Sequence, residues 1–447
     1  MSLATDSPVH SSSSDDFAAF LDGELDSISS ASLDQEEVEN DDGSDVQSMK
    51  RRKMEKMESI EEPQDSTSHR SLEENLEAST KKDVCTHPGF FGAMCILCGQ
   101  RMDDESGVTF GYIHKELRLG NDEIARLRKT DMKNLLRHKK LYLVLDLDHT
   151  LLNSTELKDL TSEEEYLRSQ TDSLQEGNLF KLDSMPMMTK LRPFVHTFLK
   201  EASTMFEMYI YTMGDRFYAS EMAKLLDPKK EYFNCRVISR DESTQRHQKG
   251  LDLVLGQESS VLILDDTESA WPKYKDNLIL MERYNYFASS CRQFGFNCKS
   301  LSELKTDENE PDGALATVLK VLKQIHNIFF DELREDLAVR DVRQVLKTIR
   351  MEVLKGCKII FSHVFPIKFQ AENHPFWRMA EQLGATCSTE LDPSVTHVVS
   401  TDIGTEKSRW AVKEKKFLVR PGWIEAANYL WQKQPEENFS LDRIKNQ

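Results

Sequence analysis

The sequence predicts an α/β fold: a doubly wound parallel sheet, joined to a small C-terminal α/β domain and preceded by a disordered acidic N-terminus. Three observations support this prediction. Short continuous apolar runs alternate with helical patterns over residues 136–305, which is typical of a parallel sheet wound by helices. Residues 1–83 are rich in Ser, Asp and Glu and contain few aromatic side chains. Residues 353–440 repeat the strand and helix alternation on a smaller scale.

The N-terminal region, residues 1–83, cannot bury enough apolar surface to offset the entropy lost on ordering, so we expect it to be disordered. It contains a basic cluster, Lys50-Arg51-Arg52-Lys53. This cluster is either a solvated charge run or a nuclear-import signal. The formal net charge of −18 argues against a general nucleic-acid binder, because phosphate contacts need a basic face.

The eight cysteines are irregularly spaced along a chain of 447 residues, which is not typical of a secreted disulfide framework. The N-terminus lacks a basic region followed by an apolar stretch, and no apolar run is long enough to cross a bilayer. We therefore expect a soluble intracellular protein without a membrane partner.

Residues 84–135 carry a Cys/His segment followed by a predicted helix at 121–136. The segment contains four candidate zinc ligands: Cys85, His87, Cys95 and Cys98. The second pair has the spacing of one half of a zinc site, and the first pair supplies the other half. However, the usual gap between ligand pairs is longer, and a free cysteine is commonly a small buried hydrophobe. A structural zinc site and packed thiols both remain open.

The main domain is predicted at residues 136–305. Its strands are continuous apolar runs, as expected for parallel strands covered on both faces. They are predicted at 141–145, 208–211, 237–238 and 261–264. The helices between them are predicted at 194–206 and 217–226. A helical linker with one apolar stripe is predicted at residues 306–352.

Polar side chains follow three of these strands. Asp146 and Asp148 follow the first, Thr212 the second, and Asp265 and Asp266 the third. Ligands of open parallel sheets bind beyond the carboxyl ends of the strands, so these side chains are expected to meet. Two carboxylates about 4 Å apart repel by roughly 4 kcal/mol at an effective dielectric near 20, so the cluster requires a cation. An all-oxygen site next to a phosphate suits Mg²⁺. The alternative, that each Asp caps a helix, explains single acids but not acid pairs at two strand ends.

This set of residues predicts phosphoryl transfer. The carboxylate of Asp146 splits hydrolysis into two steps by forming an aspartyl phosphate. Asp148 protonates the departing serine oxygen and then activates the water that opens the intermediate. Thr212 donates a hydrogen bond to a phosphoryl oxygen, and a lysine neutralises the transferring group. Spacing alone leaves three lysines open for that role: Lys249, Lys273 and Lys275.

The segment Asp146-Leu147-Asp148-His149-Thr150 resembles the DxDx(T/V) signature of the haloacid dehalogenase superfamily. Its surroundings resemble the TFIIF-associating RNA polymerase II C-terminal-domain phosphatases. Four further segments fit that pattern in order: 190–193, 209–214, 239–242 and 264–272. The match covers roughly residues 80–435 and, with the acidic N-terminus, is most similar to the plant C-terminal-domain phosphatase-like proteins.

The resemblance implies a nuclear protein-serine/threonine phosphatase that acts on the phosphorylated heptad-repeat domain of RNA polymerase II and so regulates transcription. It implies a Mg²⁺ site, with Mn²⁺ or Co²⁺ as substitutes. The implied metal-site residues are Asp146, the backbone carbonyl of Asp148, and Asp266, with Asp265 in support. Three basic residues occupy positions that contact phosphate or orient the site: Arg192, Arg240 and Lys249. Tyr211 and Trp271 also occupy motif positions, where aromatic side chains are equally expected as core.

Residues 353–440 resemble a BRCT domain. The segments that fit are two strands, at 358–361 and 396–400, the end of the first helix at 383–385, and the start of the last helix at 422–424. We expect this module to dock transcription factors and to raise the local concentration of a repetitive substrate. Some such modules bind phosphate, for which Ser362 with Lys407 or Lys413 would serve.

Two other functions remain open. One is a catalytically weak scaffold that recruits partners through the BRCT-like module, which the complete acid set opposes. The other is a small-molecule phosphatase of the same superfamily. That function favours a large cap domain, and the polar stretch at residues 153–189 fits either a small insertion or a cap.

Overall fold

The computed structural model describes residues 85–101, 107–170, 178–296, 298–331, 339–366 and 370–441. The predicted disorder of residues 1–83 and the basic cluster within them lie outside these ranges. None of the helices in the described ranges is long and apolar enough to cross a membrane.

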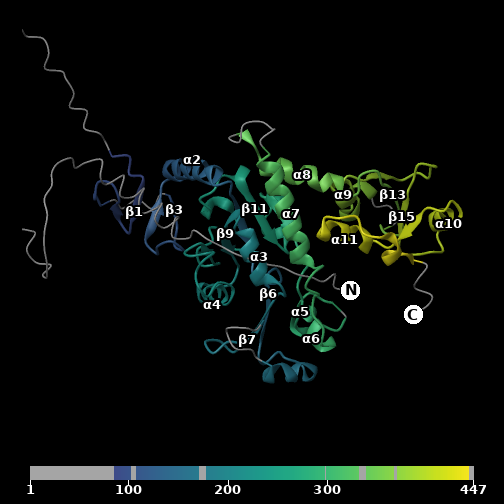
Figure 1. Cartoon of the computed structure of the whole chain (residues 1–447), viewed down its shortest axis with the longest axis horizontal. Helices are drawn as coiled ribbons and strands as arrows, with labels where there is room; N and C mark the ends of the chain where they lie inside the picture. Colours follow the sequence, from purple (N-terminus) through teal and green to yellow (C-terminus); the bar gives the residue numbers. More distant parts are fainter. Residues whose placement is uncertain are drawn as a thin grey trace, which may run out of the picture.

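A five-stranded parallel sheet forms the centre of the molecule, as predicted (Figure 1). Its strand order is β10 (Val237–Ile238), β9 (Phe206–Tyr211), β5 (Leu141–Leu145), β11 (Val261–Asp265) and β12 (Leu278–Leu280). Every residue of β5 and β11 is buried, which explains their continuous apolar sequences. The sequence did not predict β12, because three apolar residues are too few to distinguish a strand from a loop.

Other elements cover both faces of this sheet. On one face Leu143 packs with the helices α3 (Val195–Ala202), α4 (Arg216–Leu226) and α7 (Ala314–Phe329). On the other face Tyr142 packs with α2 (Asn121–Arg137) and with residues of an N-terminal sheet. The α/β, doubly wound architecture predicted from the sequence is therefore confirmed.

Two predicted helical stretches are shorter than expected. The helix expected at 194–206 ends at Ala202, because the chain turns at Ser203 and Phe206 already begins β9, where it pairs with Leu141. The helical linker holds two helices, α7 and α8 (Val342–Glu352), rather than one. The predicted apolar stripe of α7 packs in the main core.

The residues before α2 form a small antiparallel sheet that the sequence did not predict. Its order is β2 (Met94–Cys95), β1 (Gly89–Phe91), β4 (Leu117–Leu119) and β3 (Val108–Thr109). Strands of two or three residues are too short to show a period of two. The hydroxyl of Tyr112 donates a hydrogen bond of 2.8 Å to the carbonyl of Leu253 and so connects this part of the chain to the main domain.

The polar stretch at 153–189 contributes to a three-stranded antiparallel sheet with the order β6 (Leu152–Glu156), β8 (Met187–Leu191) and β7 (Leu179–Lys181). This sheet extends below the central sheet in Figure 1, beside α5 (Ala288–Gln293) and α6 (Leu301–Leu304). It is inserted between β5 and α3, so it begins directly after the first pair of predicted catalytic acids.

The C-terminal domain has its own four-stranded parallel sheet and its own core. The strand order is β14 (Thr386–Ser388), β13 (Lys358–Ser362), β15 (His397–Ser400) and β16 (Phe417–Val419). Its helices are α9 (Pro375–Gln382), α10 (Glu406–Lys413) and α11 (Gly422–Leu430). Trp423 is fully buried in this core.

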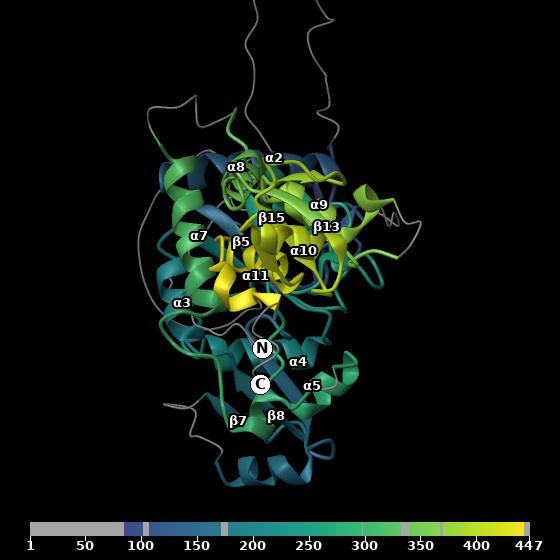
Figure 2. The same ribbon diagram turned by 90° about the vertical axis from the view of Figure 1, so that its right-hand side faces the viewer.

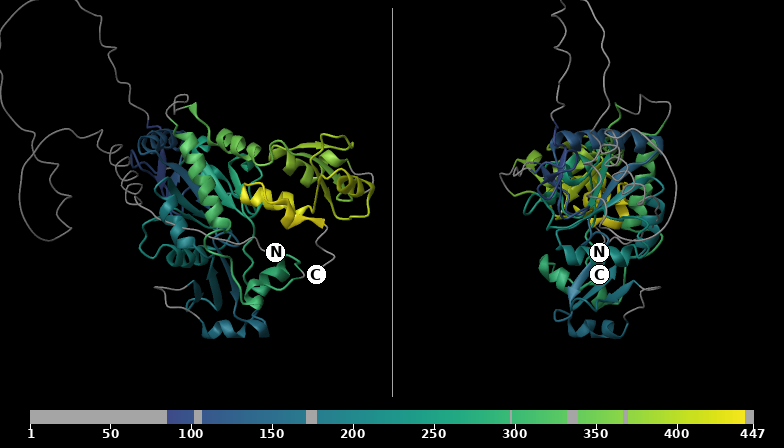
Figure 3. Two further views of the ribbon diagram at one scale, coloured as in Figure 1. Left: turned by 45° about the vertical axis from the view of Figure 1, so that its right-hand side comes forward. Right: turned by 90° about the vertical axis from the view of Figure 1, so that its left-hand side faces the viewer.

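The C-terminal domain packs directly on the main domain. Trp431, which follows α11, joins the core formed by α7 and α8. Arg350 of α8 donates a hydrogen bond of 2.7 Å to Asn428 of α11. Figure 2 shows this domain in front of the central sheet with α7 at its side, and the left view of Figure 3 shows it at the opposite end of the molecule from α2 and the N-terminal sheet.

Candidate active site

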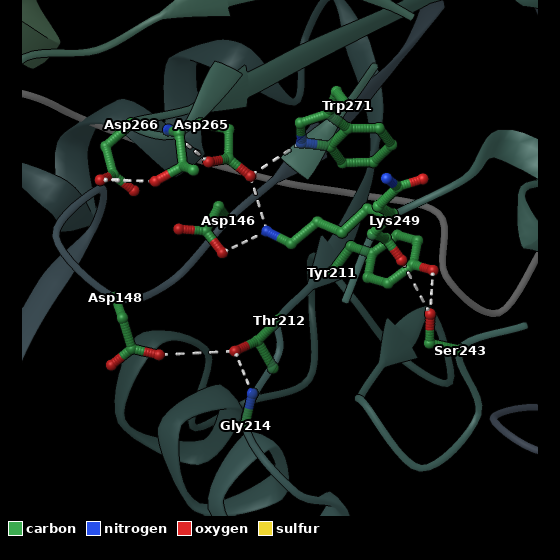
Figure 4. A network of polar contacts seen from close by, with 12 residues as sticks. Asp146, Asp148, Tyr211, Thr212, Gly214, Ser243, Lys249, Asp265, Asp266 and Trp271 are labelled. Carbon is green, nitrogen blue, oxygen red and sulfur yellow. Dashed lines mark hydrogen bonds and ion pairs between the residues drawn. The ribbon is translucent and has the colours of Figure 1, made fainter. Parts of the chain in front are cut away.

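The carboxyl ends of three neighbouring strands bring the predicted acids together. Asp146 follows β5, Asp265 ends β11, and Thr212 follows β9. Because the chain adds β9 on one side of β5 and β11 on the other, the strand order reverses at β5, where open sheets form their binding crevice. Oxygen atoms of Asp146, Asp265 and Asp266 lie within 4.8 Å of one another (Figure 4).

Lys249 lies between two of these acids. Its Nζ atom is 2.5 Å from Oδ1 of Asp146 and 2.6 Å from Oδ2 of Asp265, and its side chain is only 3% exposed. The backbone N–H of Lys249 donates to the carbonyl of Ala270, which holds this loop against the end of β11. By contrast Lys273 and Lys275, which spacing left open, are exposed.

The two acids at the end of β11 have different surroundings. Oδ2 of Asp265 accepts hydrogen bonds from Lys249 and from the indole N–H of Trp271 (2.8 Å), and Oδ1 accepts one from the N–H of Thr267 (2.8 Å). These hydrogen bonds fix the Asp265 carboxylate in place, and Asp265 in turn positions the Lys249 ammonium group. Asp266 accepts hydrogen bonds from the Thr267 hydroxyl and from Arg283, both at Oδ2.

Asp148 lies beside the carboxylate cluster, and its side chain points to the β9 side of the site. Oδ1 accepts a hydrogen bond of 2.5 Å from the hydroxyl of Tyr218, and Oδ2 lies 3.4 Å from Oγ1 of Thr212. Oγ1 of Thr212 also accepts a hydrogen bond of 3.0 Å from the N–H of Gly214, which orients the hydroxyl (Figure 4). These contacts differ from the metal-ligand role implied for Asp148, which concerns its backbone carbonyl.

Burial and mutual repulsion shift the ionisation of this cluster. Burial, and then the neighbouring Asp265, raise the pKa of Asp146 well above its ordinary value, against the opposing effect of Lys249. Burial also raises the pKa of Asp148, although the Tyr218 hydroxyl acts in the opposite direction. Burial alone would lower the pKa of Lys249, but Asp146 and Asp265 outweigh it and raise that pKa. The lysine is therefore charged, and the raised pKa values of Asp146 and Asp148 reflect burial and repulsion that one lysine does not offset.

The donor set fits a hard divalent cation. Its oxygen atoms come only from carboxylates, two of which are buried, and the lysine compensates only part of their charge. Oxygen ligands of this kind suit Mg²⁺ better than soft metals. Asp146 and Asp266 would hold the ion, because both oxygens of Asp265 already accept hydrogen bonds from protein groups.

The two predicted arginines lie in different environments. Arg192 is completely buried and forms a two-point ion pair with Glu308, at 2.9 and 2.7 Å, and donates 3.0 Å to the carbonyl of Thr150. These contacts suit orientation of the loop that carries Asp148 rather than direct contact with phosphate. Arg240 is 54% exposed, and its backbone N–H donates to the carbonyl of Gly214 at the rim of the site.

Several residues of this site were not identified from the sequence. Tyr218 lies in an amphipathic helix, and Arg283 follows the unpredicted strand β12. Nothing in the sequence around either residue indicates that it belongs to the site. Glu308 meets Arg192 across more than a hundred residues. The sequence did not decide whether Trp271 belongs to the site or only to the hydrophobic core. Its ring is buried in the core, and its indole N–H also donates a hydrogen bond to Asp265.

The second predicted cluster also assembles. Single ligand atoms of Cys85, His87, Cys95 and Cys98 lie within 4.8 Å of one another, next to the β1–β2 hairpin and away from the Asp cluster in sequence.

Comparison with known families gives two matches. Residues 141–331 match the NLI interacting factor-like phosphatase family, and residues 350–427 match the BRCA1 C Terminus (BRCT) domain. The first region contains every acid of the cluster around Lys249, and the second coincides with the domain built on β13–β16.

Known proteins resemble this chain over all or most of its length. It is 64% identical to the RNA polymerase II C-terminal domain phosphatase-like 4 of Arabidopsis thaliana, over 100% of this chain and 99% of that protein. It is 44% identical to the RNA polymerase II C-terminal domain phosphatase-like 3 of the same organism, over 71% of this chain and 26% of that protein. Among solved structures it resembles Fcp1, described as an essential RNA polymerase II CTD phosphatase. The two share 25% identity and a TM-score of 0.55, over 71% of this chain and 100% of that one.

Proposed function

Because this chain belongs to the RNA polymerase II C-terminal-domain phosphatase family, we propose that it removes phosphate from phosphoserine in the heptad repeats of that polymerase domain through an aspartyl phosphate on Asp146. The observation that supports this most directly is the position of Asp146. It is buried at the end of β5, in contact with Lys249 and beside Asp266.

In the first step an oxygen of Asp146 attacks phosphorus, and the bond from phosphorus to the serine oxygen breaks. Asp148 gives its proton to that departing oxygen, a role that its raised pKa favours. Lys249 fixes the orientation of the Asp146 carboxylate through Oδ1 and offsets the negative charge of the transferring group. Thr212, oriented by the N–H of Gly214, supplies a hydroxyl for a phosphoryl oxygen.

In the second step water attacks phosphorus of the aspartyl phosphate. Asp148 now accepts the proton from that water, the bond from phosphorus to the Asp146 oxygen breaks, and inorganic phosphate leaves. Tyr218 keeps Asp148 directed at the reacting atoms in both steps. Mg²⁺ bound by Asp146 and Asp266, with Mn²⁺ or Co²⁺ as substitutes, would neutralise negative charge on the phosphoryl oxygens.

The choice of serine rests on the family. The insertion at 152–191 supports a peptide rather than a small molecule, because its described residues form a three-stranded sheet and one short 3-10 helix rather than a large cap domain, and an extended peptide needs an open site. A nuclear location follows from the proposed substrate. The BRCT domain, packed beside the catalytic domain through Trp431, would dock transcription partners and keep a repetitive substrate nearby.

Within the BRCT domain, two of the three residues considered for phosphate binding lie together. Nζ of Lys407 is 3.2 Å from the carbonyl of Phe361, next to Ser362, whose hydroxyl donates to Thr405 at 2.8 Å. Lys413 is exposed at the end of α10. Ser362 and Lys407 are therefore the two side chains that would contact a phosphate group bound by this domain.

A phosphopeptide panel tests the proposal. Heptad-repeat peptides, each phosphorylated at one position, are incubated with the full chain in Mg²⁺ or in excess chelator, and released phosphate is measured. We expect Mg²⁺-dependent release from phosphoserine peptides and none from the Asp146→Asn variant. Full activity of Asp146→Asn would contradict the proposed nucleophile. Release only from small metabolites, with peptides untouched, would favour the small-molecule alternative.

A further inference from the structure

The Cys/His cluster at the β1–β2 hairpin has the dimensions of a tetrahedral metal site. Sγ of Cys85 is 3.8 Å from Sγ of Cys95, and Sγ of Cys98 is 3.6 Å from Nδ1 of His87. Bonds of about 2.3 Å to sulfur and about 2.0 Å to nitrogen, at tetrahedral angles, separate two sulfurs by about 3.8 Å and sulfur from nitrogen by about 3.5 Å. The observed separations therefore fit one ion at the centre of the four atoms.

The backbone around the cluster supports charged sulfur ligands. The N–H of Leu97 points to Sγ of Cys95, and the N–H of His87 points to Sγ of Cys85, both at 3.4 Å. The N–H of Gly99 donates to the carbonyl of Cys95, which closes the turn that brings Cys98 back toward the first sulfur. Amide donors aimed at sulfur stabilise thiolates, the form in which cysteine binds metal.

Two backbone positions are set for this arrangement. His87 has a positive φ of 48°, which residues other than glycine rarely adopt, and its ring nitrogen lies beside Sγ of Cys98. Gly99 has a φ of 69°, a conformation that glycine adopts without strain. Both residues lie at the points where the chain bends around the cluster.

The competing explanations fit less well. A disulfide requires sulfurs about 2.05 Å apart, whereas Cys85 and Cys95 are 3.8 Å apart and all the cysteines are free. Packed thiols should be buried, but Cys98 is exposed and Cys85 is only half-buried. Neither alternative accounts for the ring nitrogen of His87 beside a thiol.

We propose that Cys85, His87, Cys95 and Cys98 bind one structural zinc ion that fastens the N-terminal sheet. Three thiolates and one imidazole are soft or borderline ligands that select zinc over magnesium, whereas the carboxylates of the catalytic cluster select the opposite. With four protein ligands the coordination shell is complete, so this ion holds structure and takes no part in hydrolysis.

The proposed ion has a clear structural purpose. The ligands come from just before β1, from β2 and from the turn after it, and β1 and β2 share only two paired positions, Phe90 with Cys95 and Phe91 with Met94. So short a hairpin has little core of its own, and small units of this kind commonly depend on a metal or a disulfide. β4 of the same sheet contributes Leu117 and Leu119 to the core that covers one face of the catalytic sheet.

The test is the metal content of the full chain. Protein purified without added zinc and passed through a desalting column is analysed by inductively coupled plasma mass spectrometry. We expect one zinc per chain, lost in Cys98→Ser and retained in Cys298→Ser, a matched change at another exposed cysteine. Asp146→Asn should also retain zinc, so failure of this proposal and failure of the proposed catalytic function are separable.

A second measurement guards against a variant that fails to fold. Wild-type protein stripped with a chelator and titrated with Co²⁺ should develop the visible absorption of tetrahedral cobalt bound to thiolates, and zinc should abolish it. Absence of zinc together with absence of that spectrum would overturn the proposal. So would equal zinc in Cys98→Ser and wild type, a Cys85–Cys95 disulfide in non-reduced peptide maps, or iron in place of zinc.

Discussion

Replacing Lys249 with Met tests the electrostatic basis of the site. Met has nearly the same length but no charge, so the change removes both ion pairs of the lysine, at 2.5 and 2.6 Å, without opening a large cavity. Each pair corresponds to about 6.5 kcal/mol of attraction at an effective dielectric near 20. Desolvation of the lysine cancels much of that sum, and removal of one partner from a buried pair commonly costs about 3–5 kcal/mol of stability.

We therefore expect Lys249→Met to lower the free energy of unfolding by about 3–5 kcal/mol in chelator. The loss should be smaller in Mg²⁺, because a bound cation stabilises the folded state by mass action and takes over part of the neutralisation. Turnover of a phosphoserine peptide should fall about 10²–10³-fold, as when a preorganised donor to transition-state charge is removed.

The assays are urea unfolding with and without Mg²⁺ and steady-state phosphate release. Lys275→Met is the matched control, since Lys275 is exposed and pairs only with the exposed Glu268 among the described residues. That control should change stability by less than about 0.5 kcal/mol. If Lys249→Met unfolds like wild type in chelator and keeps more than a tenth of wild-type turnover, the role assigned to this lysine is wrong.

Three further substitutions separate catalysis from folding. Tyr218→Phe removes the hydrogen bond that directs Asp148 at the reacting atoms. Hydrogen bonds to charged groups are worth about 1.5–3 kcal/mol, so we expect roughly tenfold to hundredfold slower turnover and a loss of stability no greater than that amount. Unchanged turnover would exclude a positioning role. Arg192→Met leaves Glu308 buried without its partner and should cost about 3–5 kcal/mol in urea unfolding. Arg240→Met should leave stability unchanged and raise KM for a phosphopeptide, since its side chain is exposed at the rim; the opposite pattern for the two arginines would refute their assignment.

The part of the site that the sequence predicted depends on strand ends. A buried parallel strand is a continuous apolar run, so its end is visible as the first polar residue, and topology then places Asp146, Thr212 and Asp265 at one edge. The order of the sheet confirms this reasoning. Only the family resemblance singled out Lys249, because nothing in its local sequence distinguishes it from other lysines between strands.

The remaining parts of the site depend on contacts between segments far apart in the sequence. The hydroxyl of Tyr218 reaches Asp148 across 70 residues, and Glu308 reaches Arg192 across 116. A tyrosine in an amphipathic helix carries the same pattern whether its hydroxyl serves a catalytic acid or only the core. Strands of two or three residues, such as β1 and β2, likewise leave no periodic signal.

The two clusters were predicted from different kinds of information, because their residues are spaced differently along the sequence. The Cys/His set is local, since all four residues fall within 14 positions from Cys85 to Cys98, and spacing alone suggests it. The Asp set is assembled by the sheet from segments that begin more than a hundred residues apart, so it exists only if the fold is right. The proposed zinc site needs only this local segment, whereas the carboxylates come together only in the folded sheet. Loss of the hairpin cluster should consequently loosen the N-terminal sheet while leaving the Asp146 site assembled, and loss of the central sheet must abolish catalysis altogether.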